Sequence, residues 1–540
     1  MQRLLAGASV ACLVLAGLVM PSPAGATDVV ILVRPSASQG TIALRLGTQF
    51  AWPGGLDRAA DSRSRFDALA PRLVRINATT DGAPGLPLVM PAGITQGDWD
   101  FTNLDSIVKD ARRAGAQVAL DIAYAPQWMW DCSTGAIRDP TFGEFAGYMA
   151  RVVSYYNAGS FIAEDGRVVV NPAGSANRID YWELWNEPDL RTLGCPPAGN
   201  PNISAPEYLT MWNATAPAIL AVDPSVKLIG PATSSALTMN SPDYLPTLIT
   251  GAKRKPDAVS FHAYGGWENS QMDRFFFDGD SSCCGLPGLE RGVAQVQATA
   301  PGIPVWLTEL NVNAAWDEDD PAQRPWTAFG ATWSASAFLR LARRGVDAAY
   351  EFGFAHPTLR QFSRIEIDTG RPLLPYWVDY YFTRYFPPGS TLIEASTSDG
   401  EVETIAARPP GSRDVHVLVV NRKVESDSAV GGLGLPANVR VNVQDLEPIE
   451  AVTLRQIDAA TPLDTGPQAE SLAPSNSVSV AFSGYGVALL EFVIQPCCAN
   501  TPSCRDDDTA PQERRRPQSS TGADLKADGC QYPHGRSRLA

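Results

Sequence analysis

The sequence is poor in histidine and in basic residues. It holds four histidines among 540 residues, and none lies at metal-ligand spacing from a pair of cysteines. A zinc site is therefore the weaker interpretation of its nine cysteines. Lysine and arginine number 43 against 58 acidic residues, which gives a net charge of −15 and a pI near 4.8. This balance argues against a nucleic-acid partner, because phosphate backbones require a basic surface.

Further absences narrow the class of protein. No glycine-rich phosphate loop follows any strand-like run, which weakens a nucleotide-binding interpretation, and no segment repeats with a solenoid period. Beyond the N-terminal segment no apolar run is long enough to span a bilayer, so we expect no stable insertion in a membrane. With 44% hydrophobic and 19% charged residues, the chain has the composition of a globular protein with a sizeable core.

Residues 1–26 have the features of an export signal. Arg3 supplies a short positive region, residues 4–20 form an apolar stretch, and the Ala-Gly-Ala sequence at 24–26 resembles a cleavage site. A retained membrane anchor is the alternative, although the apolar stretch is short for a membrane span. We therefore expect a secreted or periplasmic protein from which the signal peptide is removed.

The cysteines agree with export. Removal of the signal takes away Cys12 and leaves eight, an even number that suggests disulfide bonds. Cys132 and Cys195 each follow a predicted strand and could form one such bond, whereas direct pairing of the adjacent Cys283 and Cys284 would be strained. The other four cysteines lie in residues 496–540, a polar, proline-rich and charged tail for which we expect disorder.

From about residue 41 to 386, strand-like apolar runs alternate with amphipathic stretches. Capping boxes at Thr141 with Glu144 and at Ser204 with Glu207 predict the starts of two helices, and residues 327–344 have helical periodicity. Eight strands that alternate with helices imply an α/β fold, a parallel sheet closed into a (β/α)8 TIM barrel, with an open doubly wound sheet as the alternative. The predicted strands are 42–46, 73–77, 117–122, 179–185, 226–230, 258–262, 305–310 and 348–352.

After residues 387–390, Pro-Pro-Gly-Ser, the pattern changes to short alternating apolar runs, which predict a C-terminal antiparallel β-sandwich. An additional strand of this sandwich from residues 27–40 is an alternative that we keep open. The expected organisation is a signal peptide over 1–26, a barrel over 27–388, a sandwich over 389–495 and the tail over 496–540.

The most informative segment is Trp185-Asn186-Glu187-Pro188, which closes the predicted strand 179–185. It places Glu187 in a loop just past a strand, beside the amide of Asn186. A second such carboxylate, Glu309, lies at the end of the predicted strand 305–310. Because loops at the C-terminal ends of barrel strands build the active site, the two glutamates can meet there. Such a pair is what acid/base cleavage of a glycosidic bond requires, and spacing in the sequence leaves retention and inversion both open.

Three other glutamates compete with this pair. We interpret Glu183, on the same strand as Glu187, as half of a buried ion pair, with Arg75 as its partner. Glu318 belongs to an acidic run that is typical of a solvated loop, and Glu351 is the remaining competitor.

Polar and aromatic side chains gather at the other predicted strand ends. A cation such as Arg75 would lower the pKa of a nucleophilic carboxylate, and a hydrogen bond from Tyr264 would hold that carboxylate in place. His262 and Tyr264 alternate on one strand and share a face, with a buried core pair as the alternative. The candidate substrate-binding residues are Asn186, Arg75, His262, Tyr264, Trp128, Trp267 and Asn311, and the further strand-end residues are Asp121, Tyr124, Trp130, Trp316 and His356.

The chain resembles the clan A glycoside hydrolases, and within them family 39, the group of β-xylosidases and α-L-iduronidases. The resemblance extends over roughly residues 41–390 and is carried by residues 181–190, 227–232, 259–265 and 307–309. It implies that Glu187 is the general acid/base and Glu309 the nucleophile. It also implies that Asn186 binds the hydroxyl next to the anomeric carbon.

The function implied by the resemblance is that of an exported, retaining glycoside hydrolase that acts on an oligosaccharide or polysaccharide without a metal or organic cofactor. Xylosidase-like exo action and endo action both stay open. The sequence departs from many relatives at the end of the eighth strand, where it has Phe352, Phe354 and His356 instead of a tryptophan platform. The alternative function is that of a non-catalytic carbohydrate-binding protein on a glycosidase scaffold.

Overall fold

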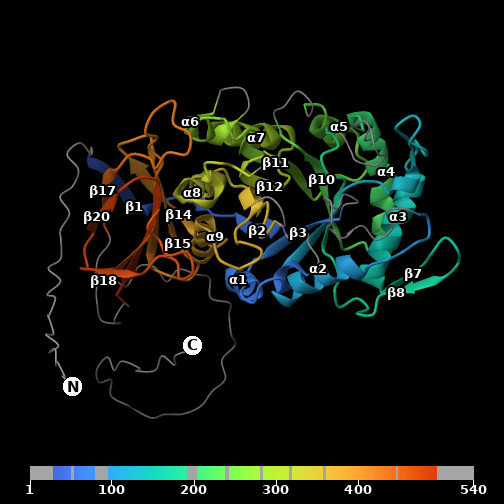
Figure 1. The fold of residues 1–540 in the computed structure, drawn as a ribbon, viewed down its shortest axis with the longest axis horizontal. Helices are drawn as coiled ribbons and strands as arrows, with labels where there is room; N and C mark the ends of the chain where they lie inside the picture. The colour runs from blue at the N-terminus through green and yellow to red at the C-terminus, as the bar shows by residue number, and fades with distance from the viewer. Residues whose placement is uncertain are drawn as a thin grey trace, which may run out of the picture.

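The computed structural model describes residues 28–49, 54–78, 95–190, 203–236, 242–279, 284–315, 319–356, 360–445 and 448–495. The predicted signal peptide and tail, and the residues Cys195, Cys283, Trp316 and Glu318, lie outside the described residues. The described part consists of a barrel surrounded by helices and, on one side of it, a curled sheet (Figure 1). None of its helices is long and apolar enough to cross a membrane.

The barrel is closed by eight parallel strands that follow one another in sequence order, which confirms the predicted TIM barrel. All eight predicted strands are present, but the first begins three residues later than expected. Ile42 instead exchanges backbone hydrogen bonds with Gly389 and Ser390, where the chain passes between the two domains. The strands are β2 (Arg45–Gln49), β3 (Leu73–Ala78), β4 (Gln117–Ile122), β9 (Tyr181–Leu184), β10 (Lys227–Thr233), β11 (Ala258–Gly266), β12 (Val305–Asn313) and β13 (Ala348–Glu351).

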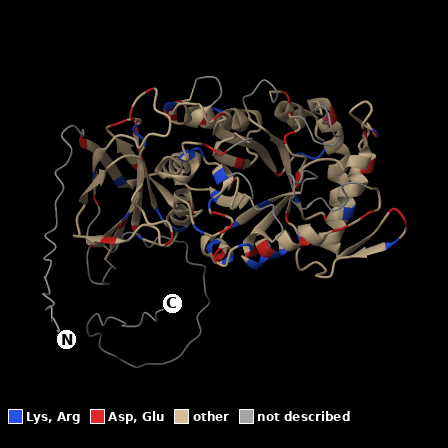
Figure 2. Ribbon diagram, in the orientation of Figure 1, with Lys and Arg blue, Asp and Glu red and all other residues tan. Residues whose placement is uncertain are grey.

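Helices cover the outside of the barrel (Figure 1). They are α1 (Ser62–Leu69), α2 (Thr102–Arg113), α3 (Gly143–Val153), α4 (Ala205–Val222), α5 (Tyr244–Gly251), α6 (Asp273–Asp278), α7 (Gly285–Thr299), α8 (Ala328–Arg343) and α9 (Leu374–Tyr385). Two hairpins interrupt the alternation, β5 (Trp130–Asp131) with β6 (Ala136–Ile137) and β7 (Ser160–Ile162) with β8 (Val168–Val170). Acidic and basic residues are interspersed over the described parts of both domains (Figure 2).

One predicted capping box is present and the other is wrong. Ser204 caps α4, since its hydroxyl accepts a hydrogen bond from the backbone N–H of Glu207 and its own N–H donates to the Glu207 carboxylate. Before α3 the capping group is Asp139, whose carboxylate accepts from the backbone N–H of Glu144 at 3.0 Å and from that of Thr141 at 2.9 Å. A carboxylate satisfies the open N–H groups at a helix start, so Thr141 is not needed as the cap.

The second domain is a nine-stranded sheet in the order β19-β18-β21-β16-β15-β14-β1-β17-β20. The sheet is antiparallel except between β1 and β17, and it curls around an apolar core of its own. The strand β1 belongs to this sheet, so the boundary predicted for the barrel at residue 27 is wrong and the alternative for residues 27–40 describes the chain. The strands are β1 (Asp28–Thr41), β14 (Thr391–Thr397), β15 (Val402–Arg408), β16 (Val415–Asn421), β17 (Ala437–Val443), β18 (Ile449–Ile457), β19 (Glu470–Leu472), β20 (Ser477–Phe482) and β21 (Gly486–Ile494).

A buried ion cluster lies behind the eighth barrel strand. Tyr350 belongs to the apolar cluster inside the barrel, so Glu351, the next residue of β13, points outward. Arg364 contacts Glu351 through Nη2 and donates from Nε to the carboxylate of Asp379 at 2.8 Å. The pKa of Glu351 is raised to about 8 and that of Asp379 to about 6, because burial disfavours their charge more than Arg364 favours it. Glu351 is therefore a structural residue rather than a competitor of Glu309.

We expect this cluster to make folding stability fall as the pH rises. The folded-state pKa of Glu351, about 8, lies above its ordinary value of 4.5. The stabilisation from the protonated carboxyl is therefore complete below pH 4.5 and is lost as the pH rises through 8. Glu351→Gln keeps the shape and cannot ionise, so its Tm should change less between about pH 5 and pH 8 than that of the wild type. Glu470→Gln, an exposed control, should follow the wild type, and equal slopes for all three proteins would contradict the prediction.

Candidate active site

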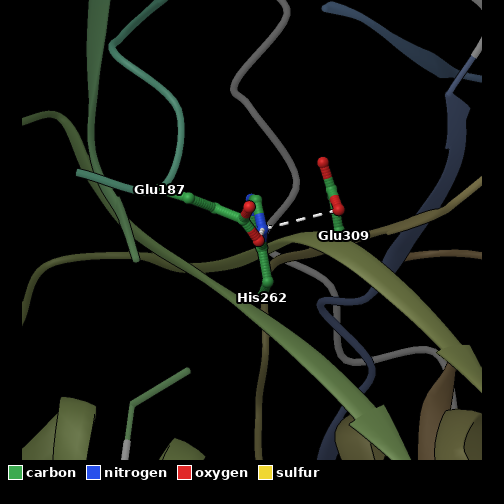
Figure 3. A group of neighbouring side chains, drawn as sticks. All are labelled: Glu187, His262 and Glu309. Carbon is green, nitrogen blue, oxygen red and sulfur yellow. Dashed lines mark hydrogen bonds and ion pairs between the residues drawn. The ribbon is translucent and has the colours of Figure 1, made fainter. Parts of the chain in front are cut away.

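The loop that presents Glu187 has an unusual backbone. Trp185 and Glu187 have φ angles of 75° and 45°, in the left-handed region that residues other than glycine rarely occupy. Two backbone hydrogen bonds hold the loop, from Asn186 N to Ala123 O at 3.0 Å and from Glu187 N to Ala232 O at 2.9 Å. Because Ala123 directly follows β4 and Ala232 lies on β10, the two strands that flank β9, the loop holds the carboxylate over the barrel, next to His262 (Figure 3).

Glu309 lies on β12 with both carboxylate oxygens engaged. Oε1 accepts a hydrogen bond from Arg75 Nη1 at 2.8 Å, and Oε2 accepts one from the hydroxyl of Tyr264 at 2.6 Å. The side chain of Glu309 is 8% exposed, against 22% for Glu187. Burial and the negative charge of Glu309 raise the pKa of Tyr264 well above its ordinary value, so the phenol keeps its proton and stays a donor.

Arg75 binds five side chains, and Glu309 is one of them. Its side chain is fully buried, and its five N–H groups are matched by five hydrogen bonds, the full capacity of a guanidinium. The sequence suggested Arg75 either as the buried partner of Glu183 or as a cation beside the nucleophile. In the structure it has both contacts, with Glu183 and with Glu309. Its bonds go to Glu183 Oε2 (2.6 Å), Glu309 Oε1 (2.8 Å), Gln49 Oε1 (2.9 Å), Asn186 Oδ1 (2.9 Å) and Asp121 Oδ2 (3.0 Å).

One guanidinium cannot neutralise three carboxylates. Asp121 and Glu183 are direct neighbours in the register of β4 and β9, and both are fully buried. Burial raises the pKa of Asp121 well above its ordinary value; the charge of Arg75 opposes this shift and that of Glu183 adds to it. The raised pKa favours the neutral form of Asp121, which reduces the negative charge that surrounds Arg75.

His262 bridges the two glutamates. Its Nδ1 lies 2.8 Å from Glu187 Oε1 and 3.5 Å from Glu309 Oε2, as Figure 3 shows. Burial acts to lower the pKa of His262, but the charge of Glu309 and the hydrogen bond with Glu187 outweigh it, and the net shift is upward. The raised pKa favours a proton on the imidazole, and a proton on Nδ1 would be donated to the carboxylate of Glu187.

The two glutamates are as close as a retaining glycosidase requires. One carboxylate oxygen of each and one nitrogen of His262 all lie within 4.8 Å of one another. Carboxyl groups about 5 Å apart serve retention, whereas inversion needs a gap of roughly 6.5 to 9.5 Å for a water molecule. The short distance between the glutamates therefore favours retention over inversion, which spacing in the sequence could not distinguish.

Asn311, a candidate for substrate binding, is held by the backbone at both ends of its side-chain amide. It is fully buried. Its Nδ2 donates to the carbonyl of Phe352 and its Oδ1 accepts from the N–H of Val312 at 2.6 Å. Both ends of the amide are bonded to backbone, so it ties β12 to the end of β13.

The candidate tryptophans differ in what their rings contact. Trp130 is 5% exposed and packs against Trp185 with ring centroids 6.1 Å apart, so it belongs to the core. Trp128 is partly buried, and the guanidinium of Arg138 lies 6.0 Å from its ring centroid. Trp267, which follows β11, is 47% exposed and presents the most open surface of the three.

Two residues of the site were missed in the sequence. Gln49 binds Arg75, and it was overlooked because the first predicted strand ended at residue 46 and not at 49. The ring of Phe362 lies 5.1 Å from that of Phe352 and 6.5 Å from that of Tyr264, and no motif marks it. Burial lowers the pKa of the neighbouring His356 to about 4, so this aromatic group carries no charge near neutral pH.

Comparisons with known proteins agree with this geometry. The family model described as Glycosyl hydrolases family 39 matches residues 95–356, a range that contains Glu187, His262, Tyr264 and Glu309. No match was found among curated protein sequences.

Solved structures resemble the chain over most of its length. A monomeric beta-xylosidase from Caulobacter crescentus has 17% identity and a TM-score of 0.60, over 86% of this chain and 100% of that chain. A glucosidase from Croceicoccus marinus has 15% identity and a TM-score of 0.59, over 87% and 100%. A GH39 enzyme from Xanthomonas axonopodis pv. citri has 15% identity and a TM-score of 0.58, over 86% and 97%. At such identities the structural likeness shows the fold, a barrel with a companion sheet.

The family match and the paired glutamates lead to the same conclusion. The matched range holds both glutamates and the two residues of β11 that contact them, and Arg75 completes the set from outside that range. The chain is therefore a clan A glycoside hydrolase of the family 39 type, an enzyme that cleaves O-glycosyl bonds with retention.

Proposed function

We propose that this enzyme hydrolyses oligosaccharides by double displacement and removes xylosyl or closely related pyranosyl units in the manner of a β-xylosidase. The observation that carries the proposal is the unequal surroundings of two glutamates whose oxygens lie within 4.8 Å. Glu309 is buried with Arg75 and Tyr264 on its oxygens, and Glu187 is more exposed with His262 on one oxygen. The first arrangement suits a nucleophile and the second suits an acid that later exchanges protons with water.

In the first step a carboxylate oxygen of Glu309 attacks the anomeric carbon. The bond from that carbon to the leaving oxygen breaks, and the leaving oxygen takes the proton of Glu187. Because His262 binds Oε1 of Glu187, the other oxygen of that carboxyl is free to carry the proton. Asn186, held by Arg75 through Oδ1, keeps its NH2 group for a sugar hydroxyl.

In the second step the glycosyl ester on Glu309 is hydrolysed. Glu187, now ionised, takes a proton from a water molecule whose oxygen attacks the anomeric carbon, and the ester bond to Glu309 breaks. Arg75 and Tyr264 stabilise the carboxylate that departs, because both donate hydrogen bonds to it. Two displacements at one carbon restore the original anomeric configuration.

The similar structures described as a beta-xylosidase and a glucosidase support a pyranosidase. The test is a panel of aryl β-xylosides, β-glucosides and related glycosides, together with plant and bacterial polysaccharides. Early proton NMR spectra of the reaction should show the β-anomer as the first product. Oligosaccharide release from polymers alone would replace exo action with endo action. Binding without turnover would favour the non-catalytic alternative.

We also propose that the protein is exported. The eight cysteines that remain after removal of the signal support this, because an even number suggests disulfide bonds, which persist in oxidising compartments. Cys195, the expected partner of Cys132, lies outside the described residues. N-terminal sequencing of the protein from the culture medium or the periplasm should begin after residue 26, and a protein confined to the cytoplasm with its first residues intact would contradict export.

Glu187→Ala should cause a loss that depends on the leaving group. A nitrophenolate leaves without a proton, so formation of the glycosyl ester from a nitrophenyl glycoside should be nearly normal. A sugar or alkyl alcohol needs the proton, so kcat/KM for such substrates should fall by about 10²- to 10⁴-fold. Single-turnover kinetics on a series of aryl and alkyl glycosides measures the difference. An equal loss across the series would show that Glu187 is not the acid.

A further inference from the structure

We infer that the two domains together form a second carbohydrate-binding surface beside the catalytic centre, which holds sugar units of an oligosaccharide beyond the bond that is cleaved. This inference rests on the proposed function. The surface, here called the shared rim, consists of Trp267 and Met272 from the segment after β11 and of Val430 and Leu433 from the loop between β16 and β17.

The shared rim is apolar and open to solvent. Trp267 is 47% exposed, Met272 50%, Val430 49% and Leu433 72%. Large side chains of this kind are normally scattered singly over a surface, and a group of them marks an interaction site. An exposed indole with aliphatic neighbours suits the C–H faces of a pyranose ring, which pack on flat apolar surfaces.

Direct contacts bring the two segments together. The N–H of Asp273, next to Met272, donates to the carbonyl of Ala429 at 2.8 Å. The carboxylate of Asp273 accepts from the N–H groups of Gly431 at 2.8 Å and Gly432 at 2.7 Å. On the other side, the ring of Trp267 lies 5.2 Å from that of Phe275, in the first turn of α6.

The loop of the second domain also reaches the segment after β12. Gly431 approaches Ala322 so closely that a Cβ atom on Gly431 would collide with it, and Gly431 has a φ angle of +72° that favours glycine. The segments after β11 and β12 follow the strands that carry His262, Tyr264 and Glu309. This loop of the second domain therefore reaches the segments at the catalytic end of the barrel.

A buried ion cluster holds this junction in place. Asp273 is fully buried, and Arg324 donates to it at 3.3 Å and to Asp320 at 2.7 Å. The side chain of Gln271 accepts hydrogen bonds from the N–H groups of Trp267 at 2.8 Å and Glu268 at 3.0 Å, which fixes the segment that bears the indole. A surface held in its binding conformation loses little entropy when a ligand binds.

The position of Trp267, directly after the end of β11, indicates what the shared rim binds. Trp267 lies three residues beyond Tyr264, which contacts the nucleophile. At about 3.3 Å per residue of strand this amounts to roughly 10 Å, enough for a sugar chain that starts at the catalytic pair to reach the indole. We therefore assign the shared rim to the more distant units of an oligosaccharide substrate, and we expect affinity to increase with chain length.

The first test compares substrates of different length. We expect Trp267→Ala and Leu433→Ser each to lower the ratio of kcat/KM for xylo- or cello-pentaose to kcat/KM for the matching aryl monoglycoside, by about tenfold for the tryptophan. The matched control is Ile162→Ser, which removes an equally exposed aliphatic side chain (66%) from β7 at the opposite end of the molecule (Figure 1). An unchanged ratio in both rim variants would overturn the inference.

The second test needs no turnover. Calorimetric titration of the Glu309→Gln protein with xylo- and cello-oligosaccharides of two to six units should show an affinity that rises with length, and this rise should disappear when Trp267→Ala is added. Equal Kd values with and without Trp267→Ala would refute the shared rim even if hydrolysis is found. A wild type that cleaves no glycoside would refute the proposed function, while the titration would still decide on the shared rim.

Discussion

Glu309→Ala is expected to lower kcat by at least about 10⁴-fold on every substrate. The variant lacks the oxygen that forms the bond to the anomeric carbon. No neighbour can replace it, because Asp121 and Glu183 are fully buried and bonded to Arg75. Release of the aryl group from the best nitrophenyl glycoside of the panel measures the loss.

Azide makes the same variant diagnostic. The space left by the carboxylate lets azide attack the anomeric carbon from the side of Glu309, so a β-glycoside should give an α-glycosyl azide. Glu187→Ala with azide should give the β-azide, because there azide attacks the glycosyl ester from the opposite side. Near-ultraviolet circular dichroism confirms that each variant is folded. Residual activity above about one tenth of the wild type in Glu309→Ala, or a β-azide from it, would assign the nucleophile to another residue.

Arg75→Met should have the second largest effect, because it acts on both stability and catalysis. It removes five hydrogen bonds and leaves three carboxylates around a buried apolar side chain. Loss of one partner from a buried ion pair costs about 3 to 5 kcal/mol of unfolding free energy. Loss of the cation also disfavours an ionised nucleophile, so the acidic limb of the kcat/KM profile should move to higher pH.

Arg75→Lys separates the charge from the geometry. Lysine keeps the positive charge but has three donors on one nitrogen and cannot reproduce the fork of a guanidinium. We expect an acidic limb close to that of the wild type and a kcat that stays low, because Glu309 and Asn186 are no longer held together. Urea unfolding and pH profiles of both variants provide the comparison. A methionine variant with wild-type stability and an unchanged pH profile would show that Arg75 is dispensable.

The strands of the barrel and the two glutamates could be predicted because their signals are local. A strand shows in a run of a few apolar residues, and Glu187 and Glu309 follow such runs directly. The misplaced end of the first predicted strand shows that such local signals give the bounds of a strand only approximately. Ending that first strand at residue 46 instead of 49 was enough to hide Gln49, whose amide oxygen accepts a hydrogen bond from Arg75.

The use of each polar group could not be predicted in the same way. Asn311 and Asn186 both follow or end barrel strands, yet one amide is bonded at both ends to backbone and the other is held at one end by Arg75. The difference depends on which hydrogen-bonding group lies next to each amide in the folded barrel, a backbone carbonyl for Asn311 and the Arg75 side chain for Asn186. The assignment of β1 to the second domain likewise depends on pairing with β14 and β17, hundreds of residues away in the chain.

The number and order of the barrel strands, and the carboxylates at their ends, could be predicted from the amino-acid sequence, because periodicity and strand-end position are properties of short segments. The distance between Glu187 and Glu309, and the set of buried acids that bind Arg75, became known only from the folded chain. The same holds for the loop of the second domain that reaches the catalytic end of the barrel. These features depend on contacts between distant parts of the chain, and such contacts exist only after the barrel has closed and the second domain has packed against it.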